Sequence, residues 1–273
     1  MCVTCGCSDD AEGKITNLET GEMAHNHHHH SHTLPDGTVI THSHDHEHEA
    51  LPIHAKIHGT TISLEQEILG KNNLLAAQNR GWFKGRNILA LNLMSSPGAG
   101  KTTLLTRTIN DLKQQLSISV IEGDQETIND AEKIKATGCK VIQINTGTGC
   151  HLDAAMIDRA LQQLNPPLNS VLMIENVGNL VCPALFDLGE AAKVVILSVT
   201  EGEDKPIKYP HMFRASEIMI LTKIDLLPYV QFDVQRCLEY ALQVNPHMQI
   251  FQVSATTGAG LDIWYKWLSE KVS

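Results

Sequence analysis

The sequence predicts an α/β domain with a doubly wound, mostly parallel sheet of about seven strands, of the P-loop NTPase type. From Ile88 onward, apolar strand-like runs alternate with helix-like segments, which is the pattern of a parallel sheet covered by helices. The first apolar run, 88–94, leads into a glycine-rich turn, then Lys101-Thr102, then a helical pattern. Polar residues also follow several other strand-like runs, at the edge where such sheets bind ligands.

The expected elements can be placed in order along the chain. We expect strands over residues 88–94, 118–122, 141–145, 170–175, 194–200, 218–222 and 249–254. We expect helices over residues 102–115, 130–136, 153–163, 234–243 and 260–271. Ahead of this domain, Ser63 and Gln66 have the spacing of a capping box, and apolar residues at helical spacing follow. These signals predict a leading helix over 63–80, ended by Gly81.

Composition divides the chain into two units. Residues 1–60 are polar, lack regular apolar periodicity and contain twelve of the fifteen histidines. Such a segment buries too little apolar surface to offset its ordering entropy, so we expect it to be largely disordered. Residues 61–273 are expected to form the P-loop domain with its leading helix.

Charge and composition exclude several classes of function. The net charge of −10 and the lack of a basic stripe argue against a nucleic-acid partner. We expect no membrane span, because no apolar run is long enough, and the first residues lack the pattern of a signal peptide. The odd number of cysteines, seven, argues against a disulfide framework. These features together predict a cytoplasmic protein.

The glycine-rich turn predicts a phosphate site. Its flexible backbone can point N–H groups at an anion, and the following helix adds its N-terminal dipole. Lys101 is placed to reach the β- and γ-phosphates, and the Thr102 hydroxyl to bind Mg²⁺. The general pattern begins with glycine, whereas this chain has Ser95 there, and a solvated turn is the alternative reading. The expected nucleotide contacts are Ser96, Pro97, Gly98, Ala99, Gly100, Lys101, Thr102 and Thr103.

Two carboxylates follow predicted strands and are candidates for the Mg²⁺ site. Asp124 ends the segment Glu-Gly-Asp, where it could hold Mg²⁺ or position water, or instead cap the next helix. Glu175 resembles a Walker-B acid, and Gly178 could donate its N–H to a γ-phosphate. The alternative for this pair is a strand-ending acid with a turn glycine.

The nucleotide base is predicted to be guanine. Thr222-Lys223-Ile224-Asp225 resembles the Asn-Lys-x-Asp motif of GTPases, in which the aspartate accepts two N–H donors that adenine lacks. Thr222 replaces the usual asparagine, which puts part of the bracing of this motif in doubt. Ser254-Ala255 follows the last predicted strand and matches the element that contacts guanine O6. We therefore expect GTP and GDP as the bound nucleotides.

A transition-metal site is predicted beside the nucleotide. Cys150 and His151 follow the third predicted strand, and Cys182 lies four residues beyond Gly178. Two thiolates and an imidazole suit Zn²⁺ or Ni²⁺, and buried inert cysteines are the alternative. Ordering of the loop at Gly178 by a γ-phosphate would then move the ligand Cys182. For the other two cysteines of the domain, Cys139 and Cys237, we expect a structural role.

The first sixty residues carry two further metal-binding signals. Cys2, Cys5 and Cys7 bring three soft ligands close together, which suits square-planar Ni²⁺ as well as tetrahedral Zn²⁺. The histidines between His25 and His58 could hold several ions weakly. Their spread among Asp, Glu, Ser and Thr argues against an expression tag.

These motifs together resemble the HypB GTPases, which help to insert nickel into [NiFe]-hydrogenase. The resemblance rests on Cys-x-x-Cys-x-Cys, the histidine tract, Ser-Pro-Gly-Ala-Gly-Lys-Thr, Gly-Asp-Gln-Glu-Thr, Cys-His-Leu-Asp, Glu-Asn-Val-Gly-Asn-Leu-Val-Cys-Pro and Thr-Lys-Ile-Asp-Leu-Leu. It covers the chain from about Ile57 onward, plus the N-terminal motif. The urease accessory GTPases of the UreG family are an alternative, but their Cys-Pro-His and Glu-Ser-Gly-Gly motifs are absent from this sequence.

The resemblance implies a slow GTPase that forms a GTP-dependent homodimer. It implies a metal site of Cys150, His151 and Cys182 at the dimer interface, and a tight nickel site at Cys2, Cys5 and Cys7. The implied partners are a HypA-like nickel protein, a SlyD-like prolyl isomerase and the hydrogenase large-subunit precursor. Two other functions stay open at this point: a nickel or zinc store with a regulatory GTPase domain, and an ATP-dependent metal chaperone of related fold.

Overall fold

The computed structural model describes residues 57–125 and 128–272, together with four short strands nearer the N-terminus. These strands are β1 (Lys14–Asn17), β2 (Met23–Ala24), β3 (His30–Thr33) and β4 (Val39–His42). For them, and for residues 57–65, only the backbone path is described. The predicted ligands Cys2, Cys5 and Cys7 lie outside the described residues, as does most of the segment that we expected to be disordered.

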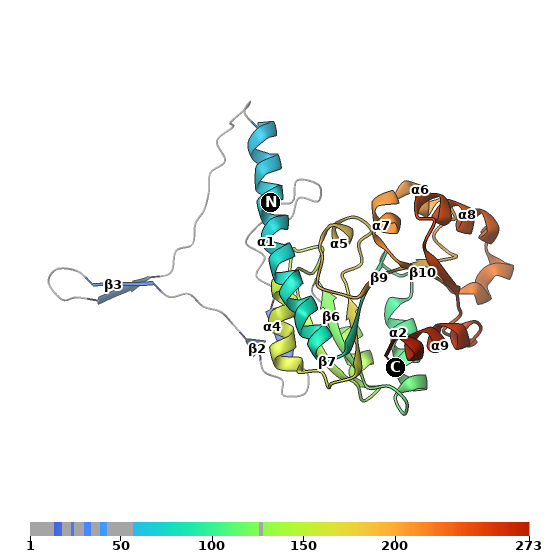
Figure 1. The fold of residues 1–273 in the computed structure, drawn as a ribbon, viewed down its shortest axis with the longest axis horizontal. Helices are drawn as coiled ribbons and strands as arrows, with labels where there is room; N and C mark the ends of the chain where they lie inside the picture. The colour runs from blue at the N-terminus through green and yellow to red at the C-terminus, as the bar shows by residue number, and fades with distance from the viewer. Residues whose placement is uncertain are drawn as a thin grey trace.

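Seven parallel strands form the centre of the molecule, which confirms the predicted fold class (Figure 1). Their order across the sheet is β11-β10-β9-β5-β8-β6-β7, so the P-loop strand β5 lies in the middle. Each corresponds to one predicted strand, with ends that differ by at most two residues. The strands are β5 (Ile88–Ser95), β6 (Ile118–Asp124), β7 (Lys140–Asn145), β8 (Ser170–Glu175), β9 (Ala192–Ser198), β10 (Ile218–Thr222) and β11 (Gln249–Gln252).

Helices cover both faces of the sheet because its strands are apolar on both sides. On one face, α2 (Lys101–Leu112) and α9 (Leu261–Val272) pack with Leu91 and Leu93 of β5. On the other face, α1 (Ile57–Gly85) and α4 (Ala154–Leu164) cover the side of β5 that carries Ala90. The remaining helices are α3 (Asn129–Lys135), α5 (Cys182–Leu185), α6 (Lys205–Lys208), α7 (Pro210–Ala215), the 3-10 helix η1 (Ile224–Tyr229) and α8 (Val234–Val244).

The leading helix α1 is longer at both ends than the predicted 63–80. It begins at Ile57 and passes through Gly81, which is exposed, to end at Gly85. Tertiary contacts account for the C-terminal extension, because Asn79 donates hydrogen bonds to the carbonyls of Ala154 and Leu188, and Phe83 is buried in the core. These contacts outweigh the modest cost of a glycine inside a helix.

The edge of the sheet beyond β7 carries the antiparallel strands β1 and β2. Within the described part of the chain, no helix is both long and apolar enough to span a membrane.

The carboxyl ends of β5, β6, β8 and β9 lie on one side of the sheet, where α5, α6 and α7 follow (Figure 1). This is the side on which the candidate site is found.

Candidate functional site

The turn after β5 has the geometry of a phosphate-binding loop. Gly98 and Gly100 have φ angles of 78° and 95°, in the region that favours glycine, and α2 begins at Lys101. The Lys101 Nζ donates to the Ser95 Oγ over 2.8 Å, so the serine found in place of glycine holds the lysine across the mouth of the loop. Burial lowers the pKa of Lys101, and the nearby acids Glu175, Asp130, Glu122 and Glu201 oppose this shift.

A pocket of about 450 Å³ opens beside this loop, and most of the residues predicted to bind nucleotide or Mg²⁺ line it. Those that line it are Pro97, Gly98, Gly100, Lys101, Thr102, Thr103, Asp124, Glu175, Gly178 and Lys223. The loop at Gly178 approaches the P-loop so closely that a Cβ there would lie 3.1 Å from the Pro97 Cγ. The other predicted contacts, Ser96, Ala99, Thr222, Asp225, Ser254 and Ala255, lie outside the lining of this pocket.

Two buried carboxylates on neighbouring strands line the pocket side by side. Glu122 and Glu175 are register partners on the neighbouring strands β6 and β8, and they are 2% and 3% exposed. The Thr102 hydroxyl donates to the Glu175 Oε1 over 2.7 Å, and the Oε2 atoms of both glutamates have no hydrogen-bond partner. Buried carboxylate oxygens without partners, beside a threonine hydroxyl, are a donor set that suits a hard divalent cation such as Mg²⁺.

Sequence reasoning missed several residues that line this pocket or contact its P-loop. Glu122 is the last residue of the predicted strand 118–122 and lies within β6, and only the alternation of strand faces could have marked it as a pocket residue. Asp130 and Lys133 also line the pocket, although they lie on α3 rather than directly after a strand. Glu201 follows β9 and accepts hydrogen bonds from the Ser96 Oγ and the Ser198 N–H.

Glu122 should make stability depend on pH in the nucleotide-free protein. Burial, together with the nearby acids Glu175, Asp124 and Asp130, raises the pKa of Glu122 from 4.5 to about 9. Between these values the folded state holds a proton that the unfolded state has released, so the free energy of unfolding falls as pH rises. At pH 7 the loss is on the order of 3 kcal/mol. We expect Glu122→Gln to remove this loss.

The measurement is urea unfolding between pH 6 and pH 8.5 with a chelator present. The Glu122→Gln variant should gain stability over the original chain as pH rises. Glu239→Gln, at an exposed site on α8, is the matched control and should leave the slope unchanged. Identical pH slopes for Glu122→Gln and the original chain would contradict the prediction.

The predicted base-reading segments are tied to the P-loop. The Thr222 hydroxyl donates to the Ala99 carbonyl over 2.7 Å, which gives a bracing contact at the position where GTPases have asparagine. The Lys223 Nζ donates to the Gly98 carbonyl over 2.8 Å. On the other segment, the Arg107 guanidinium of α2 donates to the Ala255 carbonyl over 2.9 Å. The structure therefore fixes one segment to the P-loop and the other to α2, the helix that follows it.

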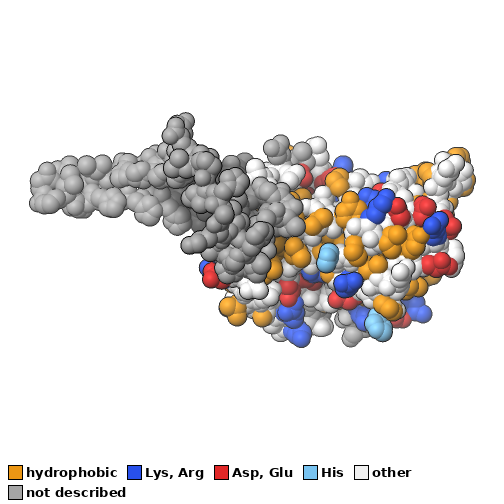
Figure 2. All heavy atoms as spheres, turned by 90° about the horizontal axis from the view of Figure 1, so that it is seen from above, with side chains coloured by type: hydrophobic (Ala, Val, Ile, Leu, Met, Phe, Trp, Pro, Cys, Tyr) orange, Lys and Arg blue, Asp and Glu red, His pale blue; other side chains and the backbone are white. Residues whose placement is uncertain are grey.

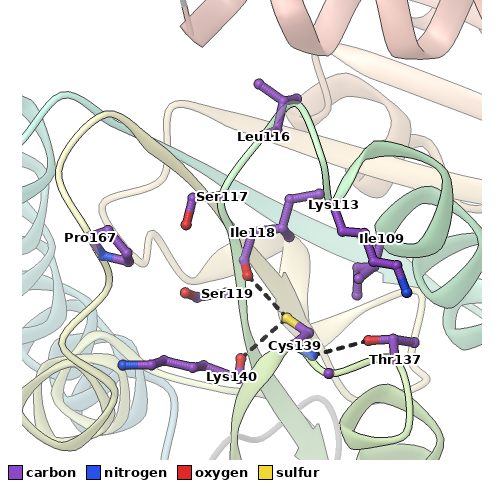
Figure 3. A pocket seen from close by; sticks show the side chains of 11 residues that line it. Ile109, Lys113, Leu116, Ser117, Ile118, Ser119, Thr137, Cys139, Lys140 and Pro167 are labelled. Carbon is purple, nitrogen blue, oxygen red and sulfur yellow. Dashed lines mark hydrogen bonds between the residues drawn. The ribbon is translucent and has the colours of Figure 1, made fainter.

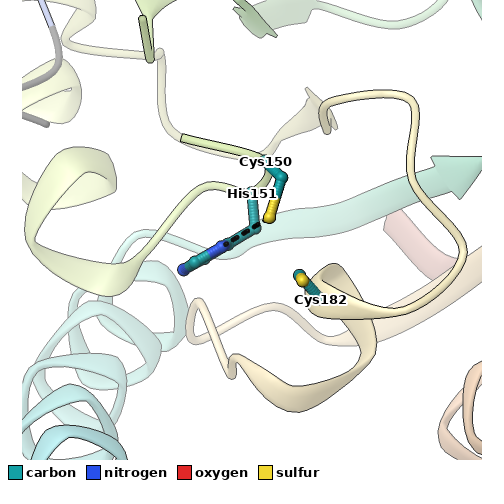
Figure 4. Close-up of side chains that lie close together, drawn as sticks. All are labelled: Cys150, His151 and Cys182. Carbon is teal, nitrogen blue, oxygen red and sulfur yellow. Dashed lines mark hydrogen bonds between the residues drawn. The ribbon is translucent and has the colours of Figure 1, made fainter. Parts of the chain in front are cut away.

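The predicted metal ligands lie together beside the pocket (Figure 4). One ligand atom each from Cys150, His151 and Cys182 lies within 4.8 Å of the others, and within the described residues this is the only such group of three. The Cys182 side chain is buried at the start of α5, whereas Cys150 is half-buried. The His151 ring stacks on Phe186 with centroids 3.9 Å apart. Burial lowers the pKa of His151, which favours the neutral imidazole that binds metal.

The other two described cysteines lie apart from this cluster. Cys139 borders a pocket of about 230 Å³ at the amino ends of β6 and β7, and its thiol donates to the Ile118 carbonyl over 3.1 Å (Figure 3). Cys237 is fully buried in α8. Burial raises the pKa of both thiols to about 12, which makes them poor nucleophiles and poor metal ligands.

The parallel sheet, the P-loop and the acids at the strand ends define a nucleotide-binding domain of the P-loop NTPase class. Residues 89–252 match the family model described as the CobW/HypB/UreG nucleotide-binding domain. Within this group, the chain belongs to the HypB family. It is 47% identical over 317 residues to the hydrogenase maturation factor HypB of Cupriavidus necator, covering 98% of this chain and 88% of the relative.

Other relatives agree with this assignment. The hydrogenase maturation factor HypB of Escherichia coli K12 is 58% identical over 207 residues, which cover 76% of this chain and 71% of that protein. The crystal structure of HypB from Archaeoglobus fulgidus has a TM-score of 0.70 at 37% identity, over 75% of this chain and all of that chain. HypB from Helicobacter pylori, solved in complex with nickel, has a TM-score of 0.69 at 38% identity, over 74% and 95%.

Proposed function

We propose that this chain is a GTP-hydrolysing nickel metallochaperone that gates nickel insertion during [NiFe]-hydrogenase maturation in the cytoplasm. One observation carries the proposal: a single loop runs from Glu175, at the floor of the nucleotide pocket, through Gly178 at the P-loop to Cys182 in the metal cluster. Relatives named as hydrogenase maturation factors, and one relative solved with nickel, support the choice of metal and pathway.

In this proposal the nucleotide phosphates bind the P-loop, and Lys101 neutralises the charge that develops on the γ-phosphoryl group. Thr102, Asp124 and Glu175 would hold Mg²⁺, which supplies further neutralisation of the phosphates. The N–H of Gly178 would contact the γ-phosphate, so that its loop differs between the GTP and GDP states. We expect slow turnover, because no arginine lines the described part of the pocket.

Three protein ligands leave one position of a tetrahedral metal site open. We propose that a GTP-dependent homodimer forms over this side of the molecule. Val181, Leu185 and Ile207 are 39–44% exposed on the segments that follow β8 and β9. Hydrophobic side chains are also grouped on the face that is seen from above in Figure 2.

Residues 1–60 would act as a second metal-binding unit. A HypA-like protein, a SlyD-like isomerase and the hydrogenase large-subunit precursor would be partners.

The proposal is tested by measuring Ni²⁺ and Zn²⁺ affinity with GDP and with a non-hydrolysable GTP analogue, while mass is recorded. In the full chain with Cys2, Cys5 and Cys7 changed to serine, Cys150 and Cys182 are the two described cysteines that lie together with a histidine. Thiolate-to-nickel absorption then reports the cluster, and the histidine tract acts as a constant buffer. A nucleotide-dependent affinity together with dimer formation supports the proposal, and an affinity equal in both states overturns it.

The histidine tract favours one rival, a nickel or zinc store whose GTPase domain only regulates assembly. Deleting residues 1–60 separates the two functions. A store would lose its role in hydrogenase maturation, whereas a GTP-driven delivery protein would keep most of it.

Cys182→Ser should weaken Ni²⁺ binding at the cluster by more than about 100-fold. Loss of groups that merely support a metal ligand costs about 10- to 100-fold, and this change removes a thiolate ligand itself. Thiolate-to-nickel absorption in the background lacking the N-terminal cysteines measures the effect. Cys139→Ser is the matched control, since that thiol lies at the opposite end of the sheet. Equal Ni²⁺ affinity in the Cys182 and Cys139 variants would show that Cys182 is not a ligand.

A further inference from the structure

Through its side-chain oxygen, Asn176 joins the end of β8 to the loop that carries Cys150 and His151. It follows Glu175 directly and is 1% exposed. Its Oδ1 accepts the N–H of Leu152 over 3.1 Å and that of Val177 over 3.0 Å. Its backbone N–H donates to the Leu93 carbonyl over 3.0 Å. The residue next to His151 is therefore fastened to the residue next to Glu175.

The metal cluster has two arms: the loop that carries Cys150 and His151, and helix α5, which begins at Cys182. The Asn176 side chain is also connected to the second arm, by a series of polar contacts. The Asn176 Nδ2 donates to the Asn92 Oδ1 over 3.1 Å, and the Asn92 Nδ2 donates to the Glu190 Oε1 over 3.2 Å. The Lys193 Nζ lies 3.9 Å from that oxygen and donates to the Ala184 carbonyl over 3.0 Å. Ala184 belongs to α5, the short helix that begins with Cys182. A buried polar chain thus connects both arms of the cluster through Asn176.

The segments joined by this series of polar contacts also touch the nucleotide pocket at two points. Glu175, which precedes Asn176, accepts the hydroxyl hydrogen bond of Thr102 on the P-loop helix. The Leu152 side chain packs against β6 at Gly123, so close that a Cβ there would lie 2.8 Å from the Leu152 Cδ2. Gly123 precedes Asp124, the other candidate Mg²⁺ ligand. Movement of Glu175 or Asp124 on nucleotide binding would therefore displace Leu152.

We propose that Asn176 is the positioning residue that transmits the state of the nucleotide pocket to the Cys150–His151–Cys182 cluster. This inference rests on the proposed function, since it assigns a residue to the coupling that the function requires. Asparagine suits the position because it presents an acceptor to Leu152 and a donor to Asn92 at the same time. An aliphatic side chain would leave both partners buried without hydrogen bonds.

The test compares Ni²⁺ affinity at the cluster with the GTP analogue and with GDP, in the full chain with Cys2, Cys5 and Cys7 changed to serine. We expect the two affinities to differ about tenfold in this background, within the usual range for coupled sites. Asn176→Ala and Asn176→Ser should reduce the difference to less than about twofold. Asn176→Asp keeps the acceptor for the Leu152 N–H but loses the donor to Asn92, so it should give a difference between those of the original and the alanine variant. If the alanine variant does not fold, the serine and aspartate variants decide.

Asn245→Ala is the matched control, because Asn245 also donates to two carbonyls, those of Phe213 and Ser216, but lies outside the polar chain. A purely structural role for Asn176 would weaken Ni²⁺ binding equally in both nucleotide states and leave the ratio intact. A normal ratio in the alanine and serine variants would overturn the inference alone. A ratio of one in the starting background would overturn the proposed function itself, and the inference with it.

Discussion

Replacing Lys101 with methionine should slow GTP hydrolysis by about a thousandfold. The Lys101 Nζ is held by the Ser95 Oγ at the mouth of the P-loop, next to the position that a γ-phosphate would take. Methionine keeps most of the length of the side chain but removes the positive charge that would stabilise the transferring phosphoryl group. The predicted loss is of the size seen when one preorganised donor to a developing negative charge is removed.

Phosphate release under single-turnover conditions measures this effect, and binding of a fluorescent GTP analogue separates affinity from chemistry. Lys113→Met is the matched control, because Lys113 is exposed just beyond the C-terminal end of the same helix. Hydrolysis by the Lys101 variant within tenfold of the original rate would exclude the role given to Lys101. The variant should also raise the pKa of Glu175 further, since Lys101 opposes the effect of burial on that carboxyl.

The sheet and the motifs at its carboxyl edge could be predicted because both follow local rules. Apolar runs bounded by turn residues mark strands, and parallel topology brings the residues after them to one edge. For this reason Thr102, Asp124 and Glu175 were predicted at one pocket from widely separated segments, and the structure places them there. The convergence of Cys150, His151 and Cys182 follows from the same rule, since β7 and β8 both end on that side.

The parts that could not be predicted depend on contacts between distant residues. Helix α1 continues past Gly81 because Asn79 and Phe83 find partners in other elements, which no local signal at Gly81 reveals. Glu122 is buried next to Glu175 only because β6 and β8 are neighbours in the sheet. The order of strands in a sheet cannot be predicted from the sequence of either strand alone. The chain from Leu152 through Asn176 to Asn92 likewise joins three separate segments.

The short helices α5, α6 and α7 also escaped prediction. Each has four to six residues, which is too short to show a helical apolar period. Each also has proline at one of its first two positions, a helix-start signal that is ambiguous with a turn. The position of Cys182 at the start of a short helix therefore could not be predicted, whereas its proximity to Cys150 could.

Asp225→Asn should reverse the choice of nucleotide base. We expect the affinity for GTP to fall about 100-fold, because a carboxylate that accepts two N–H donors is replaced by an amide that presents a donor to one of them. Xanthosine triphosphate should gain affinity, since xanthine carries an oxygen where guanine has its amino group. The structure supports this role by placing Asp225 at the start of η1, two residues after Lys223, whose Nζ is bonded to the Gly98 carbonyl.

Competition between GTP, ATP and xanthosine triphosphate for a fluorescent nucleotide measures the change in preference. Asp262→Asn, at an exposed site on α9, is the matched control and should leave the preference unchanged. Tight GTP binding by the Asp225 variant, without a gain for xanthosine triphosphate, would mean that this segment does not read guanine. Such a result, together with tight ATP binding by the original chain, would favour an ATP-dependent metal chaperone. Because Thr222 braces the P-loop through Ala99 in the original and variant chains alike, the exchange isolates base recognition from loop stability.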